Sequence, residues 1–307
     1  MITYYFRTLK DESLKTIDEV RNGVWVHVES PTDEEMETLV GEFGLDDGIL
    51  EDARDFFEVP RLERSGNATY FFTRYPYEEE KEDTDTAPLL IVMSESFVLT
   101  LAQRKVPLFE SYIEGKEEVI TTQKAKFFIQ IMTGVTAAFE KELVRLRRAV
   151  HRDRAKLRKI GNREIVRFVN YEHRLNDMVA AVVPTNTWLQ QVPNGNYMQL
   201  FNDDIELMED LMIANSQLVD SARSVLKTIQ NVRNATEAIL TNNLNATIKT
   251  LTAITIILTV PTMLSSLYGM NIGLPLSEHP NAFWLLLTFV FMIVSLLVWY
   301  FRRKDWI

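Results

Sequence analysis

Apolar and polar positions alternate along the first third of the chain in the way that strands require. Short runs of β-branched and aromatic residues, each beside turn residues, predict strands. After the second run, Thr32 followed by Glu35 predicts a helix that begins with a capping box. The stretches 54–64 and 77–85 are interpreted as loops. The predicted strands are residues 2–6, 24–28, 69–75, 89–93 and 97–101.

From about residue 122 onward, apolar positions recur at helical spacing, with one turn predicted at 192–196. Between Tyr197 and Tyr268 there is no glycine, and Pro261 is the one proline. A single helix of this length would reach ~100 Å at ~1.5 Å per residue. Because a lone helix so long is unstable in water, we expect it to pack on earlier helices of its own chain and on other copies.

Two runs near the end of the chain, 251–268 and 282–301, contain no charged residue. Each approaches the ~20 residues that a helix needs to cross a bilayer. The chain does not begin with a basic segment followed by a long apolar stretch, so the first part is expected to stay in the cytosol. Lys249 and the basic residues 302–304 flank the two spans, whereas the loop 272–281 has no Lys or Arg. This asymmetry predicts a multi-pass protein of the plasma or inner membrane with both termini in the cytosol.

Polar residues in the first span fall on one narrow face. They alternate at intervals of three and four residues, which is the spacing of a helical stripe. Two interpretations remain open: close packing between helices, or the lining of a water-filled pore by symmetric copies. Hydroxyl and amide groups suit a fully hydrated cation, and apolar side chains at the cytosolic end can gate by dewetting. The candidate pore-lining residues are Asn245, Ile248, Leu251, Thr252, Thr255, Thr259, Thr262 and Ser266.

The first span ends at Gly269, Met270 and Asn271, which form the candidate selectivity filter. Glycine permits a turn and leaves the opening unobstructed, and Asn271 offers a carboxamide oxygen to the water shell of a dication. An ordinary helix C-cap is the alternative interpretation of the same residues. Glu278 in the loop either raises the local cation concentration or is simply solvated.

Composition narrows the class of function. The 43 acidic and 33 basic residues give a net charge of −10, which disfavours nucleic acid and attracts cations. The absence of cysteine excludes disulfides and thiolate metal sites, and none of the four histidines lie at ligand spacing. No glycine-rich phosphate loop and no nucleophile near a histidine stands out, so we expect neither an enzyme nor a small-molecule substrate other than metal ions. The basic residues between 145 and 163 are interpreted as a solvated helix face.

The sequence Tyr268-Gly269-Met270-Asn271, at the end of the first of two C-terminal spans, resembles the signature of the CorA magnesium transporters. The segment 242–252, Pro261 and the basic tail 302–307 are also similar to that family. The resemblance implies an α/β N-terminal cytosolic domain, a long-helix bundle, two C-terminal transmembrane helices and a funnel-shaped homopentamer in the lipid bilayer. The implied parts are 1–121, the α/β domain; 122–245, the helical region; 246–268, the pore helix; 269–281, the loop; 282–301, the second span; and 302–307, the basic tail.

The same resemblance implies passive inward flow of Mg²⁺, and of Co²⁺ or Ni²⁺, with Mg²⁺ also bound between cytosolic domains to close the pore. Asp210 and Glu209 on the long helix, with Asp83 and Asp85 in the acidic loop, are then the candidate regulatory ligands. Asn245 corresponds to a polar ring and Leu251 to an apolar constriction. Many members have larger apolar residues at the positions of Thr255 and Thr259, so this chain departs from the family along the middle of the pore helix.

Two alternatives stay open at this point. One is a zinc transporter of the same superfamily, against which Met270 argues, because the zinc branch tends to carry Val there. The other is a membrane-anchored sensor that transports nothing, for which a hydroxyl stripe has no use.

Overall fold

The computed structural model describes residues 1–307 apart from 79–83, 155–161, 196 and 276–278. The chain divides into two compact units, Met1–Val232 and Arg233–Ile307. Helix α6 (Asn202–Tyr268, 67 residues) contributes to both units. The prediction of one very long helix is therefore confirmed, although α6 begins at Asn202 rather than near Tyr197. There the Asp204 carboxylate accepts the backbone N–H of Phe201 at 3.1 Å.

The first unit is built on a seven-stranded sheet with the order β2-β1-β3-β7-β6-β5-β4. Strands β3 and β7 are parallel, and every other neighbouring pair is antiparallel. The strands are β1 (Ile2–Phe6), β2 (Lys15–Ile17), β3 (Val24–Glu29), β4 (Leu62–Ser65), β5 (Ala68–Glu78), β6 (Thr84–Met93) and β7 (Phe97–Ala102).

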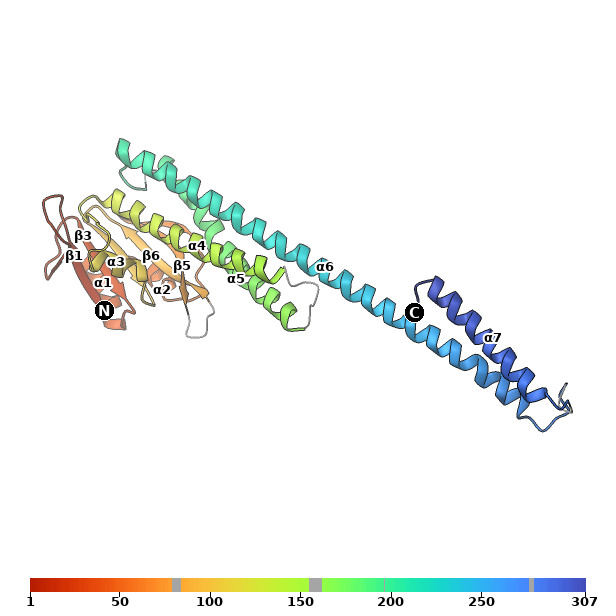
Figure 1. Ribbon diagram of the computed structural model, residues 1–307. Helices are drawn as coiled ribbons and strands as arrows, with labels where there is room; N and C mark the ends of the chain where they lie inside the picture. Colours follow the sequence, from red (N-terminus) through yellow and green to blue (C-terminus); the bar gives the residue numbers. More distant parts are fainter. Residues whose placement is uncertain (79–83, 155–161, 196, 276–278) are drawn as a thin grey trace. The chain divides into compact units, whose positions relative to one another are not determined.

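Helices cover both faces of this sheet (Figure 1). Because successive strand residues point to opposite faces, Val24 and Val26 belong to one core and Trp25 to the other. The helices α1 (Asp33–Phe43) and α2 (Asp47–Asp52) close the first core, and the predicted capping box of Thr32 and Glu35 is confirmed at the start of α1.

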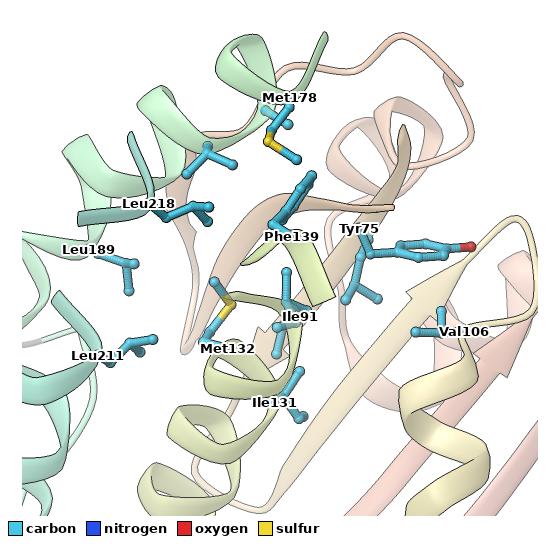
Figure 2. Close-up of a cluster of buried hydrophobic side chains, with 14 of the residues drawn as sticks. Tyr75, Ile91, Val106, Ile131, Met132, Phe139, Met178, Leu189, Leu211 and Leu218 are labelled. Carbon is cyan, nitrogen blue, oxygen red and sulfur yellow. The ribbon is translucent and has the colours of Figure 1, made fainter. Parts of the chain in front are cut away.

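The second core is the larger one. It packs the sheet against α3 (Pro107–Ile113), α4 (Lys124–Arg154), α5 (Asn162–Leu189) and the first part of α6. Figure 2 shows Ile91 of the sheet beside Ile131, Met132 and Phe139 of α4, with Leu211 and Leu218 of α6 reaching toward the same cluster. A 3₁₀ turn, η2 (Val192–Asn194), lies in the segment that was predicted to turn.

All five predicted strands are present, but the sheet is larger than the sequence pattern indicated. Strands β2 and β4 were missed because they are short edge strands of polar composition, Lys-Thr-Ile and Leu-Glu-Arg-Ser. The loop interpretation of 54–64 is wrong from Leu62 onward. The loop interpretation of 77–85 is wrong at both ends, because Tyr77 on β5 pairs with Asp85 on β6.

The second unit contains the end of α6, the connecting segment and α7 (Ala282–Arg303). Both helices are long and apolar enough to cross a membrane. The second predicted span ended at Phe301, and the helix continues through the first two basic residues of the tail.

Candidate ion-conduction pathway

Within the second unit, α7 runs back alongside the end of α6 (Figure 1). On α6 the side that faces α7 contains Ala253, which is fully buried, and Ile257 and Leu264, which are half-buried. On α7 the matching side contains Leu286, Val290, Ile293 and Leu297, which are half-buried, and Phe301, which is buried. These intervals of three and four residues define the contact face of α6 as the Ala253–Ile257–Leu264 side.

The polar stripe lies on the opposite side of α6. A helix turns by about 100° per residue, so Thr255 and Thr259 are each about 160° from Ile257 around the axis. Every residue of this stripe is exposed in the single chain. The segment therefore presents an apolar face to α7 and an uncovered hydroxyl face away from it. The stripe residues on this face are Asn245, Ile248, Thr252, Thr255, Thr259, Thr262 and Ser266.

Three threonine hydroxyls of the stripe donate their protons to the backbone of their own helix. Thr255 Oγ1 donates to the carbonyl of Leu251 at 2.8 Å, and Thr259 Oγ1 donates to the carbonyl of Thr255 at 2.7 Å. Thr262 Oγ1 lies 3.0 Å from the carbonyl of Leu258. Each proton is thereby committed, so the outward side of each oxygen carries lone pairs. The stripe offers hydrogen-bond acceptors, which suit the outward-pointing hydrogens of water around a cation.

The filter residues follow directly after α6. The Gly269 N–H donates to the carbonyl of Ser265 at 3.0 Å, and the Met270 N–H donates to the carbonyl of Leu267 at 3.3 Å. A Cβ atom at Gly269 would lie 3.3 Å from the Ser265 carbonyl oxygen, which leaves little room for a side chain. Gly269 does not adopt a positive φ, so it does not serve as a left-handed helix cap.

Met270 and Asn271 are exposed beyond the end of the helix. The structure places them, with Gly269, at the same end of α6 in one chain. Glu278 lies outside the described residues.

At the other end of the span, Ile248 and Leu251 are 51% and 63% exposed in the single chain. Exposed apolar side chains of this kind mark a surface that another chain or a lipid bilayer covers. Asn245 is also exposed, one helical turn before Ile248. The three residues predicted to form the cytosolic mouth are thus all exposed on α6, and their role there stays a prediction.

The outer surface of α7 has the features of a lipid-facing helix. Phe283 and Trp284 are exposed at one end, and Trp299 and Tyr300 are exposed at the other. Phe283 and Tyr300 are 17 positions apart, which corresponds to about 25 Å along a helix. Aromatic residues at both interfaces and basic residues beyond one of them are typical of a membrane span. The guanidinium of Arg303 lies 5.5 Å from the Trp299 ring centroid, at the basic end.

Three of the four candidate regulatory ligands lie in the described part of the chain, and they belong to two different elements. Asp210 and Glu209 are exposed on α6, and Asp85 is half-buried on β6. Asp83 lies outside the described residues. Among the residues that the structure describes, no group of three or more His, Asp or Glu side chains is placed to hold a metal ion.

Arg74 is a buried residue beside the start of β6, where Asp85 lies, and nothing in the sequence indicated this contact. Its guanidinium donates to the Thr86 carbonyl at 2.6 Å and to Thr86 Oγ1 at 2.9 Å. Burial lowers the pKa of Arg74, while the carboxylate of Asp85 acts in the opposite direction. The charge of Asp85 is thus partly compensated within its own chain.

Two apolar helices of this length, one of them with aromatic residues at both ends and basic residues beyond one end, are typical of a membrane protein. Residues 21–303 match the family described as the CorA-like Mg²⁺ transporter protein. The chain belongs to this family, and it is accordingly a divalent cation transporter of the CorA type rather than an enzyme.

Known relatives match most of the length of the chain. The cobalt/magnesium transport protein CorA of Methanocaldococcus jannaschii is 25% identical over 92% of this chain and 91% of its own length. The protein of the same name from Thermotoga maritima is 18% identical over 98% of this chain and 88% of its own length. The solved structure of the CorA magnesium transporter from M. jannaschii matches with a TM-score of 0.87 at 22% identity and covers 100% of this chain and 99% of that one. The expected fold, with its α/β soluble domain, long helix and two C-terminal apolar helices, is confirmed.

Proposed function

We propose that the chain assembles as a homopentamer and conducts hydrated Mg²⁺, and also Co²⁺ or Ni²⁺, into the cytosol down the electrochemical gradient. The observation that carries this proposal is the opposition of two faces on α6, where the side toward α7 is apolar and the far side carries the hydroxyl stripe. If several copies place their stripes around one axis, α7 of each copy lies outside and faces lipid. Packing of stripes against each other without a pore would leave their acceptor oxygens without donors.

The chemistry of the stripe fits a cation that keeps its water. Mg²⁺ dehydrates reluctantly, so the lower barrier is passage with the first water shell intact. The waters of that shell point hydrogens outward, toward the lone pairs of Thr255, Thr259 and Thr262. Neutral oxygens hold such an ion weakly enough for it to leave again. Gly269, Met270 and Asn271 act at the outer mouth, where a ring of carbonyl and carboxamide oxygens selects the hydrated dication.

Closure is assigned to the cytosolic side. Ile248 and Leu251 from each copy form an apolar ring that gates by dewetting. Mg²⁺ bound between neighbouring cytosolic domains, with Asp210 and Glu209 from one copy and Asp83 and Asp85 from another, holds this ring closed. When cytosolic Mg²⁺ falls, the ion leaves and the copies move apart. The protein lies in the plasma or inner membrane with both termini in the cytosol, as Lys249 and the basic tail support.

The deciding experiment is ion flux into liposomes that contain the purified protein. Mg²⁺, Co²⁺, Ni²⁺ and Zn²⁺ are compared under an imposed inside-negative potential. The proposal expects influx of Mg²⁺ that rises with the potential, and loss of that influx in Asn271→Ala. The matched control is Asn281→Ala, because Asn281 is an exposed asparagine at the start of α7 whose side chain makes no capping bond. Flux of Zn²⁺ alone would support the zinc transporter, and the absence of all flux from a correctly assembled protein would support the anchored sensor.

A further inference from the structure

The residues that follow α7 form a defined turn at the end of that helix. The N–H of Trp306 donates to the carbonyl of Phe301 at 3.0 Å, and the N–H of Asp305 donates to the carbonyl of Arg302 at 3.3 Å. Asp305 has a φ of +54°. These two bonds around a left-handed residue make a Schellman closure, in which the chain turns sharply back at the helix end.

The residue after this turn reaches the neighbouring helix. The Trp306 ring stacks on Phe301 with centroids 5.4 Å apart and ring planes 26° apart. Phe301 is 5% exposed, so the stack is attached to the packed side of α7. The carbonyl of Trp306 accepts a hydrogen bond from Thr250 Oγ1 of α6 at 2.9 Å. The tail therefore joins α7 to α6 by a directional bond as well as by apolar contact.

Thr250 lies on the same turn of α6 as the residues of the proposed gate. It lies between Ile248 and Leu251 in the sequence, and these two residues form the proposed apolar ring. At about 100° per residue, Thr250 points about 160° away from Ile248. A bond that holds Thr250 toward α7 therefore also fixes the direction in which Ile248 points.

We propose that Thr250 and Trp306 are positioning residues, whose hydrogen bond sets the rotation of α6 at the Ile248–Leu251 turn and so keeps the apolar ring tight when the transporter is closed. This inference rests on the proposed function, because it takes the ring as the gate. Without the bond the turn rotates more freely, and the closed transporter leaks. One neutral hydrogen bond is worth about a fivefold change in such an equilibrium.

Isosteric variants in the full-length protein test the bond. Thr250→Val removes the hydroxyl and keeps the shape, whereas Thr250→Ser keeps the hydroxyl. In liposomes at a Mg²⁺ concentration that closes the transporter, Thr250→Val is expected to raise the residual flux about fivefold, and Thr250→Ser is expected to match the unchanged protein. A second pair acts at the turn. Asp305→Gly tolerates the positive φ and keeps the closure, while Asp305→Val opposes it and should leak like Thr250→Val.

A readout that does not depend on transport comes from the absence of cysteine. A Thr252→Cys reporter is introduced into each variant, and its reaction with a membrane-impermeant thiol reagent from the cytosolic side is timed. The inference expects the Thr250→Val background to react about fivefold faster than the Thr250→Ser background. Equal labelling rates in these two backgrounds would overturn it, whatever the flux shows. If no variant and not even the unchanged protein carries Mg²⁺, the proposed function fails, while the labelling rates still decide whether the bond controls the turn.

Discussion

Replacement of Thr259 by Val should lower Mg²⁺ influx about 30-fold without loss of folding. Valine has the shape of threonine but carries no oxygen, so the change removes one acceptor from each copy. In the native chain the proton of Thr259 Oγ1 is committed to the Thr255 carbonyl at 2.7 Å. What the passing ion loses is therefore the lone pairs that received hydrogens from its water shell.

The magnitude follows from the value of a neutral hydrogen bond. Each such bond contributes about 1 kcal/mol net. An ion in the axis contacts on the order of two of the symmetry-related hydroxyls through its waters, so the barrier rises by about 2 kcal/mol, which corresponds to about 30-fold in rate. The fold tolerates the change, because a threonine bond to the preceding turn contributes little to helix stability.

The assay is the initial rate of Mg²⁺ influx into liposomes, normalised to the amount of assembled protein. Thr259→Ser keeps the oxygen and should retain most of the flux. Thr288→Val is the matched control, since Thr288 Oγ1 makes the same kind of bond to the Trp284 carbonyl at 2.8 Å but lies exposed on α7. The reasoning is refuted if Thr259→Val and Thr288→Val transport at rates within about twofold of each other.

Three further predictions concern regulation, stability and packing. At a Mg²⁺ concentration that closes the unchanged protein, Asp210→Asn should carry at least about tenfold more flux than the unchanged protein. The reason is that a carboxylate that binds a dication about 1.4 kcal/mol more tightly than the amide shifts the closing equilibrium about tenfold. Measurement of the flux as a function of cytosolic Mg²⁺ tests this. Burial lowers the pKa of His27 to about 4, so His27 is neutral in the folded chain and protonated in the unfolded chain below pH 6.5 or so. The free energy of unfolding should therefore fall as the pH drops from about 6.5 to about 4, by up to about 3 kcal/mol, and His27→Leu should flatten this slope in chemical denaturation. For the exposed His173, the hydrogen bond that its ring N–H donates to the Asp177 carboxylate raises the pKa, and His173→Asn should leave that slope in place. Ala253→Leu should destabilise the α6–α7 contact by about 1–3 kcal/mol, since Ala253 is 0% exposed, whereas Ile256→Leu on an exposed position should be nearly neutral in thermal unfolding.

The sequence predicted the elements that depend on long, strong patterns. The helix that ends at Tyr268 was evident because neither glycine nor any proline except Pro261 interrupts it. The five longer strands were evident from their β-branched and aromatic runs. The edge strands β2 and β4 were not, because an edge strand of polar residues lacks both the alternation and the apolar content on which strand prediction depends.

For the candidate site, periodicity predicted the stripe but could not show which way it faces. The side of α6 that meets α7 depends on which apolar positions fit against α7, and several assignments satisfy the sequence. Ala253 and Phe301 decide it in the structure, because both are buried at that contact. The bond between Thr250 and Trp306 had no sequence signal, since it joins a hydroxyl to a backbone carbonyl 56 positions away. Arg74 was missed for a similar reason, because its partners are backbone carbonyls and a hydroxyl rather than acids nearby in sequence.

The most direct test of the central claim is water accessibility along α6 in the membrane. Because the chain has no cysteine, single cysteines can be placed at Thr252, Thr255 and Thr259 and, for comparison, at the exposed apolar positions Ile254 and Ile256. In liposomes under conditions that open the transporter, a small water-soluble thiol reagent should modify the first three positions rapidly and the last two slowly, and Mg²⁺ should protect the reactive ones. Rapid modification at Ile254 and Ile256 with slow modification of the threonine positions would contradict an aqueous path along the hydroxyl face.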